Sequence, residues 1–314
     1  MIQVHRDLEN LPKFKNAVIT IGTFDGVHLG HQQIIKQLKE EAAQIDGETV
    51  IITFHPHPRK IVSEGKREIK ILTTLDEKIE LLNEKGVDHL VVVPFNSSFS
   101  NQTAEEYIEK FLVKKFQPHT IIIGYDHRFG KGRSGDYHLL EDLGLKYNYR
   151  VKEIPEHILN HVTISSTRVR EALLNSDVDE ASHLLGYPYF FEGKVVEGKK
   201  LGRTIGYPTA NLQIEEEEKL IPGNGVYAVE VTIDKAPEVF KGMMSIGTNP
   251  TVGGTKRTIE VNIFEFDKEI YGQTVRVYVK YYLRSEVKFN SLDELKLQLA
   301  QDKIDSEEKL KGQK

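Results

Sequence analysis

A pair of histidines stands in a glycine-containing loop near the start of the sequence. The run Gly-Thr-Phe-Asp-Gly-Val-His-Leu-Gly-His ends with His28 and His31, three residues apart. This spacing places both rings on one face at the start of a helix. The N–H groups and dipole of a helix N-terminus attract phosphate, and imidazoles can donate hydrogen bonds to oxygens that gain charge. The loop favours a polyphosphate site. Capping or packing is the alternative, and no nearby carboxylates complete a metal site.

Two further loops follow predicted strands in the first half of the chain. Residues 54–59 read Phe-His-Pro-His-Pro-Arg, and their prolines stiffen a loop that can hold a flat ring against Phe54. A simple rigid turn explains this loop equally well. Residues 124–130 read Gly-Tyr-Asp-His-Arg-Phe-Gly and offer an acid, aromatic rings and a cation. A solvated loop has a similar composition, so these two segments are candidates for ring binding.

A run of hydroxyl side chains opens a predicted helix at residues 164–170, which read Ile-Ser-Ser-Thr-Arg-Val-Arg. The hydroxyls can cap the helix, or they can hold a phosphate together with Arg168. Capping does not explain Arg168, because the helix dipole disfavours a cation in the first turn unless an anion is present. The pattern therefore predicts an anion beside Arg168.

A basic, glycine-rich loop occupies residues 198–211 in the second half of the chain. It reads Gly-Lys-Lys-Leu-Gly-Arg-Thr-Ile-Gly-Tyr-Pro-Thr-Ala-Asn, which suits a mobile flap over phosphates. Thr209 and Asn211 are two residues apart, so their side chains share one side of an extended segment. Their oxygens suit Mg²⁺, which takes its other ligands from phosphate and water. The alternative is a surface hairpin.

A carboxylate stands on the polar side of an alternating segment at residues 258–263. Ile259, Val261 and Ile263 share one face, and Glu260 shares the other with Asn262. A carboxylate on a rigid strand is a good general base for a hydroxyl. An exposed strand face is the competing interpretation.

The elements that must position these residues change character along the chain. The first half alternates short apolar runs with helical patterns, which begin after His31 and at capping boxes opened by Thr74 and Thr103. This order predicts an α/β domain with a doubly wound parallel sheet, which binds ligands at the carboxyl ends of its strands. The expected strands are residues 17–21, 49–54, 90–93, 120–123 and about 147–154.

The second half reads as an antiparallel β-domain, in which strands are separated by breaks that contain Gly or Pro. A closing helix is expected from Ser291, with Glu294 completing a capping box. We place the domain boundary after residue 185, which gives domains at 1–185 and 186–314. The expected strands are residues 189–196, 226–233, 239–246, 258–266 and 274–280.

Composition excludes several classes of protein. A length of 314 residues predicts about two domains. The net charge of −5 disfavours a nucleic-acid partner. The absence of Cys excludes disulfides, thiolate metal sites and a Cys nucleophile. The first ten residues do not read as a signal peptide, and no apolar run is long enough to cross a membrane. We therefore expect a cytoplasmic protein.

Four motifs together resemble the adenylyltransferase half of the prokaryotic bifunctional riboflavin kinase/FAD synthetase family. They are G-T-F-D-G-V-H-x-G-H, F-x-P-x-P-R, G-x-D-x-R-F-G and I-S-S-T-R. The resemblance implies a nucleotidyltransferase domain that transfers AMP from ATP to FMN. His28 and His31 are then catalytic. His127 departs from the family, which usually has Phe there. The implied ATP and phosphate contacts are Gly22, Phe24, Gly30, Ser165, Ser166, Thr167 and Arg168, and the implied flavin contacts are Phe54, Pro56, Pro58 and Asp126.

The second half resembles the riboflavin kinase module of the same family. The matching runs are G-R-T-I-G-Y-P-T-A-N-L, G-V-Y-A-V-E-V, S-I-G-T-N-P-T, E-V-N-I-F-E-F and Y-L-R-S-E-V-K-F-N-S. The resemblance implies a six-stranded antiparallel β-barrel that phosphorylates riboflavin with ATP. It makes Glu260 the catalytic base and places Thr209 and Asn211 at the Mg²⁺. Gly202, Arg203 and Gly206 are implied to bind ATP. The sequence leaves the oligomeric state open.

Overall fold

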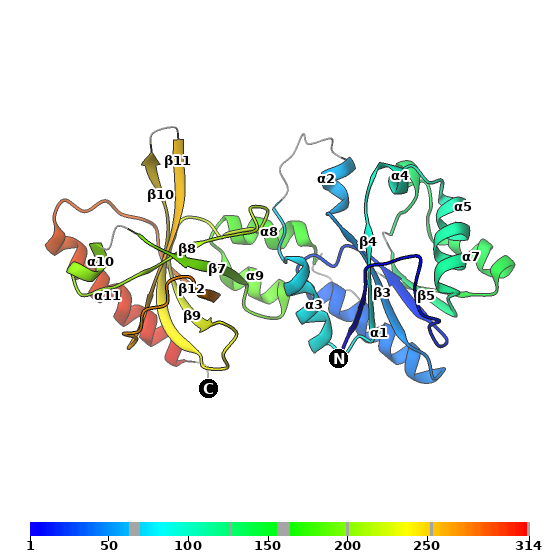
Figure 1. Ribbon diagram of the computed structural model, residues 1–314, viewed down its shortest axis with the longest axis horizontal. Coiled ribbons are helices and arrows are strands. Elements are labelled where there is room, and N and C mark those ends of the chain that lie inside the picture. Colours follow the sequence, from blue (N-terminus) through cyan, green and yellow to red (C-terminus); the bar gives the residue numbers. More distant parts are fainter. Residues whose placement is uncertain (63–69, 126, 156–163, 199–200, 252–253, 313–314) are drawn as a thin grey trace. The chain divides into compact units, whose positions relative to one another are not determined.

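The chain folds into two compact units, Met1–Ser166 and Thr167–Lys314 (Figure 1). The structure is a computed structural model that describes residues 1–62, 70–125, 127–155, 164–198, 201–251 and 254–312. The predicted boundary after residue 185 falls later in the chain, beyond helices α8 (Ser166–Leu174) and α9 (Val178–Leu185). Within the described ranges, no helix is long and apolar enough to cross a lipid bilayer.

The first unit is built on a six-stranded parallel sheet with strand order β1-β4-β3-β2-β5-β6. Its central strands are short and buried, because helices cover both faces. The chain moves from β2 toward one edge of the sheet and later returns to pair β5 with the other side of β2. This reversal is the topological switch point at which open α/β sheets bind ligands. The strands are β1 (Gln3–His5), β2 (Val18–Ile21), β3 (Thr49–His55), β4 (His89–Pro94), β5 (Thr120–Gly124) and β6 (Arg150–Ile154).

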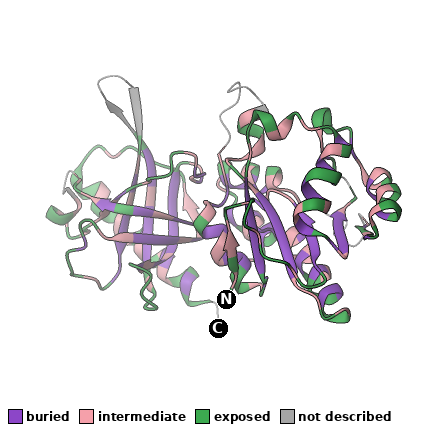
Figure 2. Cartoon of the chain, turned by 45° about the vertical axis from the view of Figure 1, so that its right-hand side comes forward, coloured by how far each residue is buried: buried purple, intermediate pink, exposed green. Residues whose placement is uncertain are grey.

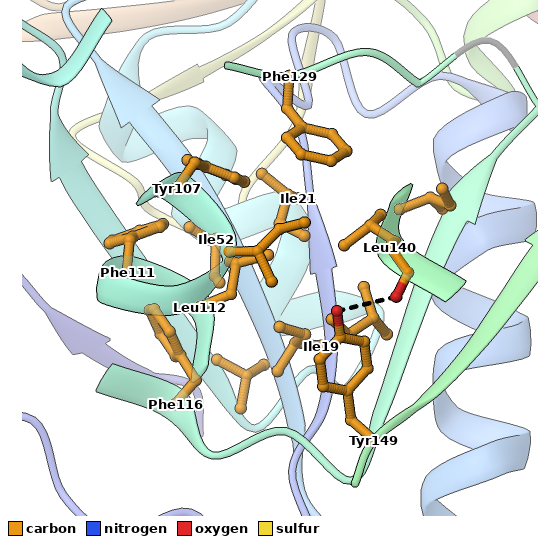
Figure 3. Packing of buried hydrophobic residues seen from close by; sticks show 14 of the residues in the cluster. Ile19, Ile21, Ile52, Tyr107, Phe111, Leu112, Phe116, Phe129, Leu140 and Tyr149 are labelled. Atoms are coloured by element: carbon orange, nitrogen blue, oxygen red, sulfur yellow. Dashed lines mark hydrogen bonds between the residues drawn. The ribbon is translucent and has the colours of Figure 1, made fainter. Parts of the chain in front are cut away.

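One face of this sheet carries an extended apolar cluster (Figure 3). Ile19 and Ile52 of the sheet pack against Tyr107 and Phe111, and all four are at most 4% exposed. The Tyr149 hydroxyl donates a hydrogen bond to the Leu140 carbonyl at 2.9 Å, which ties the start of the last strand to a covering helix. The covering segments are α5 (Ala104–Glu106), the π-helical turn η1 (Tyr107–Val113), α6 (Lys114–Phe116) and α7 (Tyr137–Tyr147).

The opposite face is covered by α1 (Leu29–Gln44) and α3 (Leu75–Glu84). Leu38 of α1 and Leu82 of α3 are completely buried. The capping box predicted at Thr74 is present, with the Thr74 hydroxyl and the Glu77 carboxylate satisfying each other's backbone N–H groups. Helices on both faces of a parallel sheet confirm the predicted doubly wound α/β fold.

Three details of the first unit differ from the sequence prediction. The last strand begins at Arg150 and not near residue 147, because α7 continues to Tyr147 and Asn148 ends it with a left-handed φ of 58°. The helix α7 itself was not predicted. The edge strand β1 also escaped prediction, because it is only three residues long and none of them is fully buried.

The second unit is a closed barrel with strand order β10-β11-β8-β7-β12-β9, and every pair of neighbours is antiparallel. This confirms the six-stranded barrel, whose strands are largely buried (Figure 2). The helix α11 (Leu292–Lys311) follows the last strand and is capped by Ser291. The strands are β7 (Phe190–Val196), β8 (Ala210–Gln213), β9 (Gly225–Ile233), β10 (Phe240–Thr251), β11 (Gly254–Ile263) and β12 (Thr274–Arg284).

The strand bounds of the barrel correct the prediction in several places. The strands predicted at 239–246 and 274–280 extend further, to Thr251 and Arg284. The sixth strand, β8, was not identified as a strand, because it has only four residues within a loop-like sequence. The strand that carries Glu260 runs from Gly254 to Ile263, so it starts and ends earlier than the predicted 258–266. At α11, the Glu294 carboxylate accepts from the Asn290 N–H at 2.9 Å instead of closing a capping box on Ser291.

Candidate active sites

The histidine loop lies between the end of β2 and the start of α1, at the switch point of the sheet. Phe24 adopts a left-handed φ of 47° although it is not glycine, which is a strained backbone conformation. Its ring is 1% exposed and folds back under the loop. A β-carbon at Gly22 would approach that ring to 3.1 Å, so a larger residue there would require the ring to shift by a few tenths of an ångström. The loop is therefore held in one specific shape.

His28 caps α1, and its ring stacks on the ring of His31. The His28 Nδ1 accepts a hydrogen bond from the His31 backbone N–H at 3.4 Å, so this part of the capping alternative is correct. The two ring centroids are 3.7 Å apart at an interplanar angle of 16°. A β-carbon at Gly30 would lie 3.2 Å from His28 Nδ1, which explains the glycine between the histidines. Because Nδ1 accepts, neutral His28 carries its proton on Nε2.

His31 is held in its neutral form. Desolvation of the ring and the neighbouring His28 and Lys78 keep the pKa of His31 well below its ordinary value. Its Nδ1 is shielded from water and has no hydrogen-bond partner among the described residues. A buried polar atom usually has a hydrogen-bond partner. This one lies in the loop that is predicted to bind phosphate.

The loop is anchored by two buried charged residues to which the sequence analysis gave no role, Asp25 and Lys78. The Asp25 carboxylate accepts hydrogen bonds from the backbone N–H groups of Leu72 and Thr73, at 2.9 and 3.1 Å. Lys78 lies in α3, is 7% exposed and interacts electrostatically with Asp25. Burial lowers the pKa of Lys78 to about 8. The sequence did contain a signal for the special role of Lys78. A lysine stands close behind the helix N-cap, where the helix dipole disfavours a cation.

The hydroxyl run at the start of α8 reaches the histidine loop through Ser166. The Ser166 hydroxyl donates to the Asp25 carbonyl at 2.9 Å, and Ser165 precedes it half-buried. Thr167, which is exposed, and Arg168 fall in the second unit, where the Arg168 guanidinium donates to the Glu180 carboxylate at 2.7 Å. A carboxylate of the protein thus lies beside Arg168, and it accounts for a cation in the first turn of the helix. The phosphate role of these residues stays a prediction.

The ring-binding loop at residues 54–59 follows β3, the neighbour of β2. Phe54 is half-buried and packs against Phe95 and Phe99, with ring centroids 5.4 and 5.7 Å away. The peptide bond before Pro56 is cis, and Pro58 begins the helix α2 (Pro58–Val62). Sequence analysis missed the two additional phenylalanines, although they follow the adjacent strand β4 and share its carboxyl end.

The loop after β5 borders the histidine loop from the other side, because β5 also pairs with β2. Phe129 is buried and lies 5.2 Å from the Tyr107 ring, and His127 stacks on Phe129 at 5.9 Å. Asp126, a predicted flavin contact, lies outside the described residues. Three candidate loops therefore stand at the carboxyl ends of three adjoining strands, β3, β2 and β5.

The second candidate site lies on the barrel, where β8 and β11 pair and Glu260 stands opposite Asn211. The Thr209 hydroxyl donates to the Glu260 carboxylate at 3.1 Å. Asn262, on the same strand, donates to the Pro208 carbonyl at 2.6 Å and fixes the backbone just before Thr209. The structure thus brings together the predicted base and both predicted Mg²⁺ ligands, which are distant in the sequence.

Glycines allow the basic loop to lie against this site. A β-carbon built at Gly198 would overlap the Asn211 amide, and one at Gly202 would overlap the Tyr207 carbonyl. Gly206 has a φ of 87°, which favours glycine. Arg203 belongs to the short helix α10 (Leu201–Thr204) and forms an exposed ion pair with Glu269 at 3.7 Å. The two lysines at 199–200 lie outside the described residues.

The donor atoms at this site suit a hard cation. Thr209, Asn211 and Glu260 supply hydroxyl, amide and carboxylate oxygens, the ligand types that Mg²⁺ prefers. Among the described residues, no group of three or more His, Cys, Asp or Glu side chains could hold a metal ion. A cation here must therefore take further ligands from a bound molecule or from water.

Comparison with known families matches each unit separately. The FAD synthetase family model matches residues 11–168, and the riboflavin kinase family model matches residues 185–310. The first match contains the histidine loop and the loops after β3 and β5. The second contains the basic loop, Thr209 and Glu260.

Curated relatives match nearly the whole chain. The bifunctional riboflavin kinase/FMN adenylyltransferase of Haemophilus influenzae is 38% identical over 302 residues, covering 96% of this chain and 97% of its own length. The Escherichia coli K12 protein of the same name is 37% identical over 308 residues, covering 98% and 97%. The crystal structure of a macrolide-efflux protein from Streptococcus pneumoniae superposes with a TM-score of 0.85 at 32% identity, covering 98% of both chains.

Proposed function

The chain belongs to the family of bifunctional riboflavin kinase/FMN adenylyltransferases, and we propose that the two reactions occur at the two sites described above. The protein uses ATP to convert riboflavin to FMN and FMN to FAD. The barrel site is assigned to the kinase and the histidine loop to the adenylyltransferase. What supports this proposal is that Thr209, Asn211 and Glu260 meet in the second unit, and that the histidine loop of the first unit lies at the same sheet edge as the loops after β3 and β5.

Adenylyl transfer is assigned to the histidine loop. An oxygen of the FMN phosphate attacks the α-phosphorus of ATP, the bond from that phosphorus to the bridging oxygen breaks, and pyrophosphate leaves. Negative charge grows on the bridging oxygen as the bond breaks. The Nε2–H of His28, the neutral His31 ring and the N-terminus of α1 can stabilise this charge without a proton having to move first. Gly22, Phe24, Gly30 and Ser165–Arg168 are the proposed further phosphate contacts.

Flavin binding in the first unit is assigned to the aromatic loop after β3. Phe54, supported by Phe95 and Phe99, offers ring faces at the carboxyl end of that strand. Pro56 and Pro58 stiffen the loop, and Asp126 stays a proposed contact. Stacking on a planar ring suits this environment, because aromatic faces bind flat, polarisable groups.

Riboflavin phosphorylation is assigned to Glu260. Its carboxylate accepts the proton of the terminal ribityl hydroxyl while that oxygen attacks the γ-phosphorus, and ADP leaves. The Thr209 hydroxyl fixes the orientation of the carboxylate. Phosphoryl transfer depends mostly on positioning and on charge neutralisation. Gly202, Arg203 and Gly206 are therefore proposed to bring positive charge and backbone N–H groups to the phosphates of ATP.

Mg²⁺ is the cation proposed at Thr209 and Asn211. When bound, it would neutralise phosphate charge and orient the γ-phosphoryl group. The absence of a nucleic-acid partner stays a prediction, supported by the net charge of −5. The cytoplasmic location and the absence of a membrane partner also stay predictions.

The test is a time course with the purified protein, riboflavin, ATP and MgCl₂, in which FMN and FAD are separated by chromatography. FMN is expected to appear first and FAD afterwards. A second reaction supplied with FMN and ATP should give FAD directly. Protein that bound flavin but formed neither product would contradict the proposal.

A further inference from the structure

Lys78 is a buried cation directly beside the histidine loop. It lies in α3, four residues after the N-cap Thr74, and is 7% exposed. Its Nζ donates to the Thr53 hydroxyl of β3 at 3.4 Å, the one hydrogen bond shown for this ammonium among the described residues. The Thr53 hydroxyl in turn donates to the Thr23 carbonyl of the histidine loop at 3.1 Å, which links Lys78 to that loop.

The charge of Lys78 is balanced by Asp25, within the histidine loop. Asp25 is 1% exposed, and its carboxylate also accepts from Leu72 and Thr73. Opposite charges buried near each other are weak evidence of a contribution to stability, because desolvation of the two charges offsets their attraction. A role in shaping the loop explains the pair better.

The groups that face His31 come from three directions. His28 stacks on it from the start of α1, Phe24 packs against it at 4.7 Å, and Lys78 approaches from α3. Asp25 stands within the loop beside Lys78. A proton added to His31 would place two positive charges together in a desolvated space, which is unfavourable.

We propose that Lys78 is a positioning residue for adenylyl transfer, which with Asp25 holds the histidine loop and the His31 ring in the geometry that binds phosphate. This inference rests on the proposed function of the first unit. Lys78 acts through Asp25 and His31 and does not contact the reacting atoms. Its charge should therefore be needed as well as its volume.

The first experiment needs no substrate. Histidine titrations are followed by NMR in wild type, Lys78→Met, Lys78→Arg and Lys36→Met, and the His31 signal is identified by its loss in His31→Gln. Lys36 lies on α1, and its side chain is 65% exposed, so it is a matched control. In Lys78→Met the pKa of His31 should rise, since a like charge is removed. Lys78→Arg and Lys36→Met should leave it unchanged.

The second experiment measures FAD formation from supplied FMN and ATP between pH 5 and 9. Lys78→Met should lower kcat by about ten- to a hundredfold, as small misplacements of reacting groups do. The acidic limb of its pH profile should move to higher pH, and Lys78→Arg should recover most of the rate. If Lys78 only stabilised the fold, the acidic limb of the pH profile would lie at the same pH in the wild type and in Lys78→Met.

The outcomes separate the two claims. An identical His31 titration in wild type and Lys78→Met, or an unshifted acidic limb, overturns the inference. A wild-type protein that makes no FAD overturns the proposed function instead, while the titration still tests the role of Lys78. If circular dichroism shows that Lys78→Met is unfolded, Thr53→Val replaces it. That variant removes the hydroxyl acceptor and keeps the charge, and it should lower kcat, whereas an unchanged kcat overturns the inference.

Discussion

Glu260 and Thr209 show how a site depends on single atoms. The carboxylate accepts from the Thr209 hydroxyl at 3.1 Å, so its orientation is fixed before any substrate arrives. A carboxylate positioned in this way can take a proton from a hydroxyl that approaches its other oxygen. At the histidine loop the corresponding atoms are the His28 Nε2–H and the His31 Nδ1, which has no hydrogen-bond partner in the part of the chain that the structure describes.

Glu260→Gln tests the assignment of the base. The amide keeps the size of the side chain but cannot accept a proton from the substrate. Riboflavin phosphorylation should fall by about 10²- to 10⁴-fold. FAD formation from supplied FMN should stay within about twofold of wild type, as for a change away from that site. A mutant that kept its riboflavin kinase rate would rule Glu260 out as the base.

The lowered pKa of Lys78 predicts a pH dependence of stability. Between about pH 8 and 10.5 the unfolded chain binds more protons at this residue than the folded chain, so the free energy of unfolding should rise with pH. Relative to Lys78→Met, the rise for the first unit should be about 2–3 kcal/mol. The raised pKa of Tyr107 and of Tyr149 acts in the opposite direction, but it is common to both proteins and cancels.

Urea unfolding followed by far-ultraviolet circular dichroism at pH 7, 8, 9 and 10 measures this difference. If the free energy of unfolding changed with pH in the same way in both proteins, the pKa of Lys78 would not be lowered in the folded state.

At the scale of elements, the ends of strands determine where chemistry can occur. In the first unit the loops after β3, β2 and β5 adjoin because the strands adjoin. In the barrel, the pairing of β8 with β11 sets Asn211 opposite Glu260. Short, irregular connections next to these strands carry the glycines that let backbone and side chains approach closely.

Gly198→Ala tests the contact between the basic loop and β8. The added methyl group would overlap the Asn211 amide, which must move away from its position beside Glu260. The KM of the kinase for ATP, and its requirement for Mg²⁺, should rise by about tenfold, corresponding to the loss of one polar contact. Adenylyl transfer in the same chain is the internal control. An unchanged KM would show that the position of Asn211 does not matter for the kinase.

The sequence predicted the elements whose patterns are local. Alternation in β11, apolar runs in β2–β5 and the capping box at Thr74 all follow from neighbouring residues. It missed β1 and β8, since three or four residues carry too little periodicity to be recognised. It also missed Lys78, whose partners Asp25 and Thr53 are separated from it in sequence and meet it only in the fold. The sequence also did not indicate that the Arg168 guanidinium would donate to Glu180, a residue of the next helix; the phosphate predicted beside Arg168 stays a prediction.

At the scale of the whole molecule, one chain carries two units with different architectures and different candidate sites. The family matches divide in the same way, at residues 11–168 and 185–310. The two reactions share an intermediate, because FMN is the product of one and the substrate of the other. In the proposed assignment each site uses its own residues to bind ATP, so inactivation of one should leave the other working.

The central claim is that the two sites act independently, and a mixing experiment tests it most directly. Glu260→Gln and His31→Gln proteins are each incubated with riboflavin, ATP and MgCl₂, alone and together. We expect little FMN or FAD from Glu260→Gln alone and FMN without FAD from His31→Gln alone. The mixture should form FAD, because FMN released by one protein is adenylylated by the other. A mixture of folded proteins that made FMN but no FAD would contradict the account.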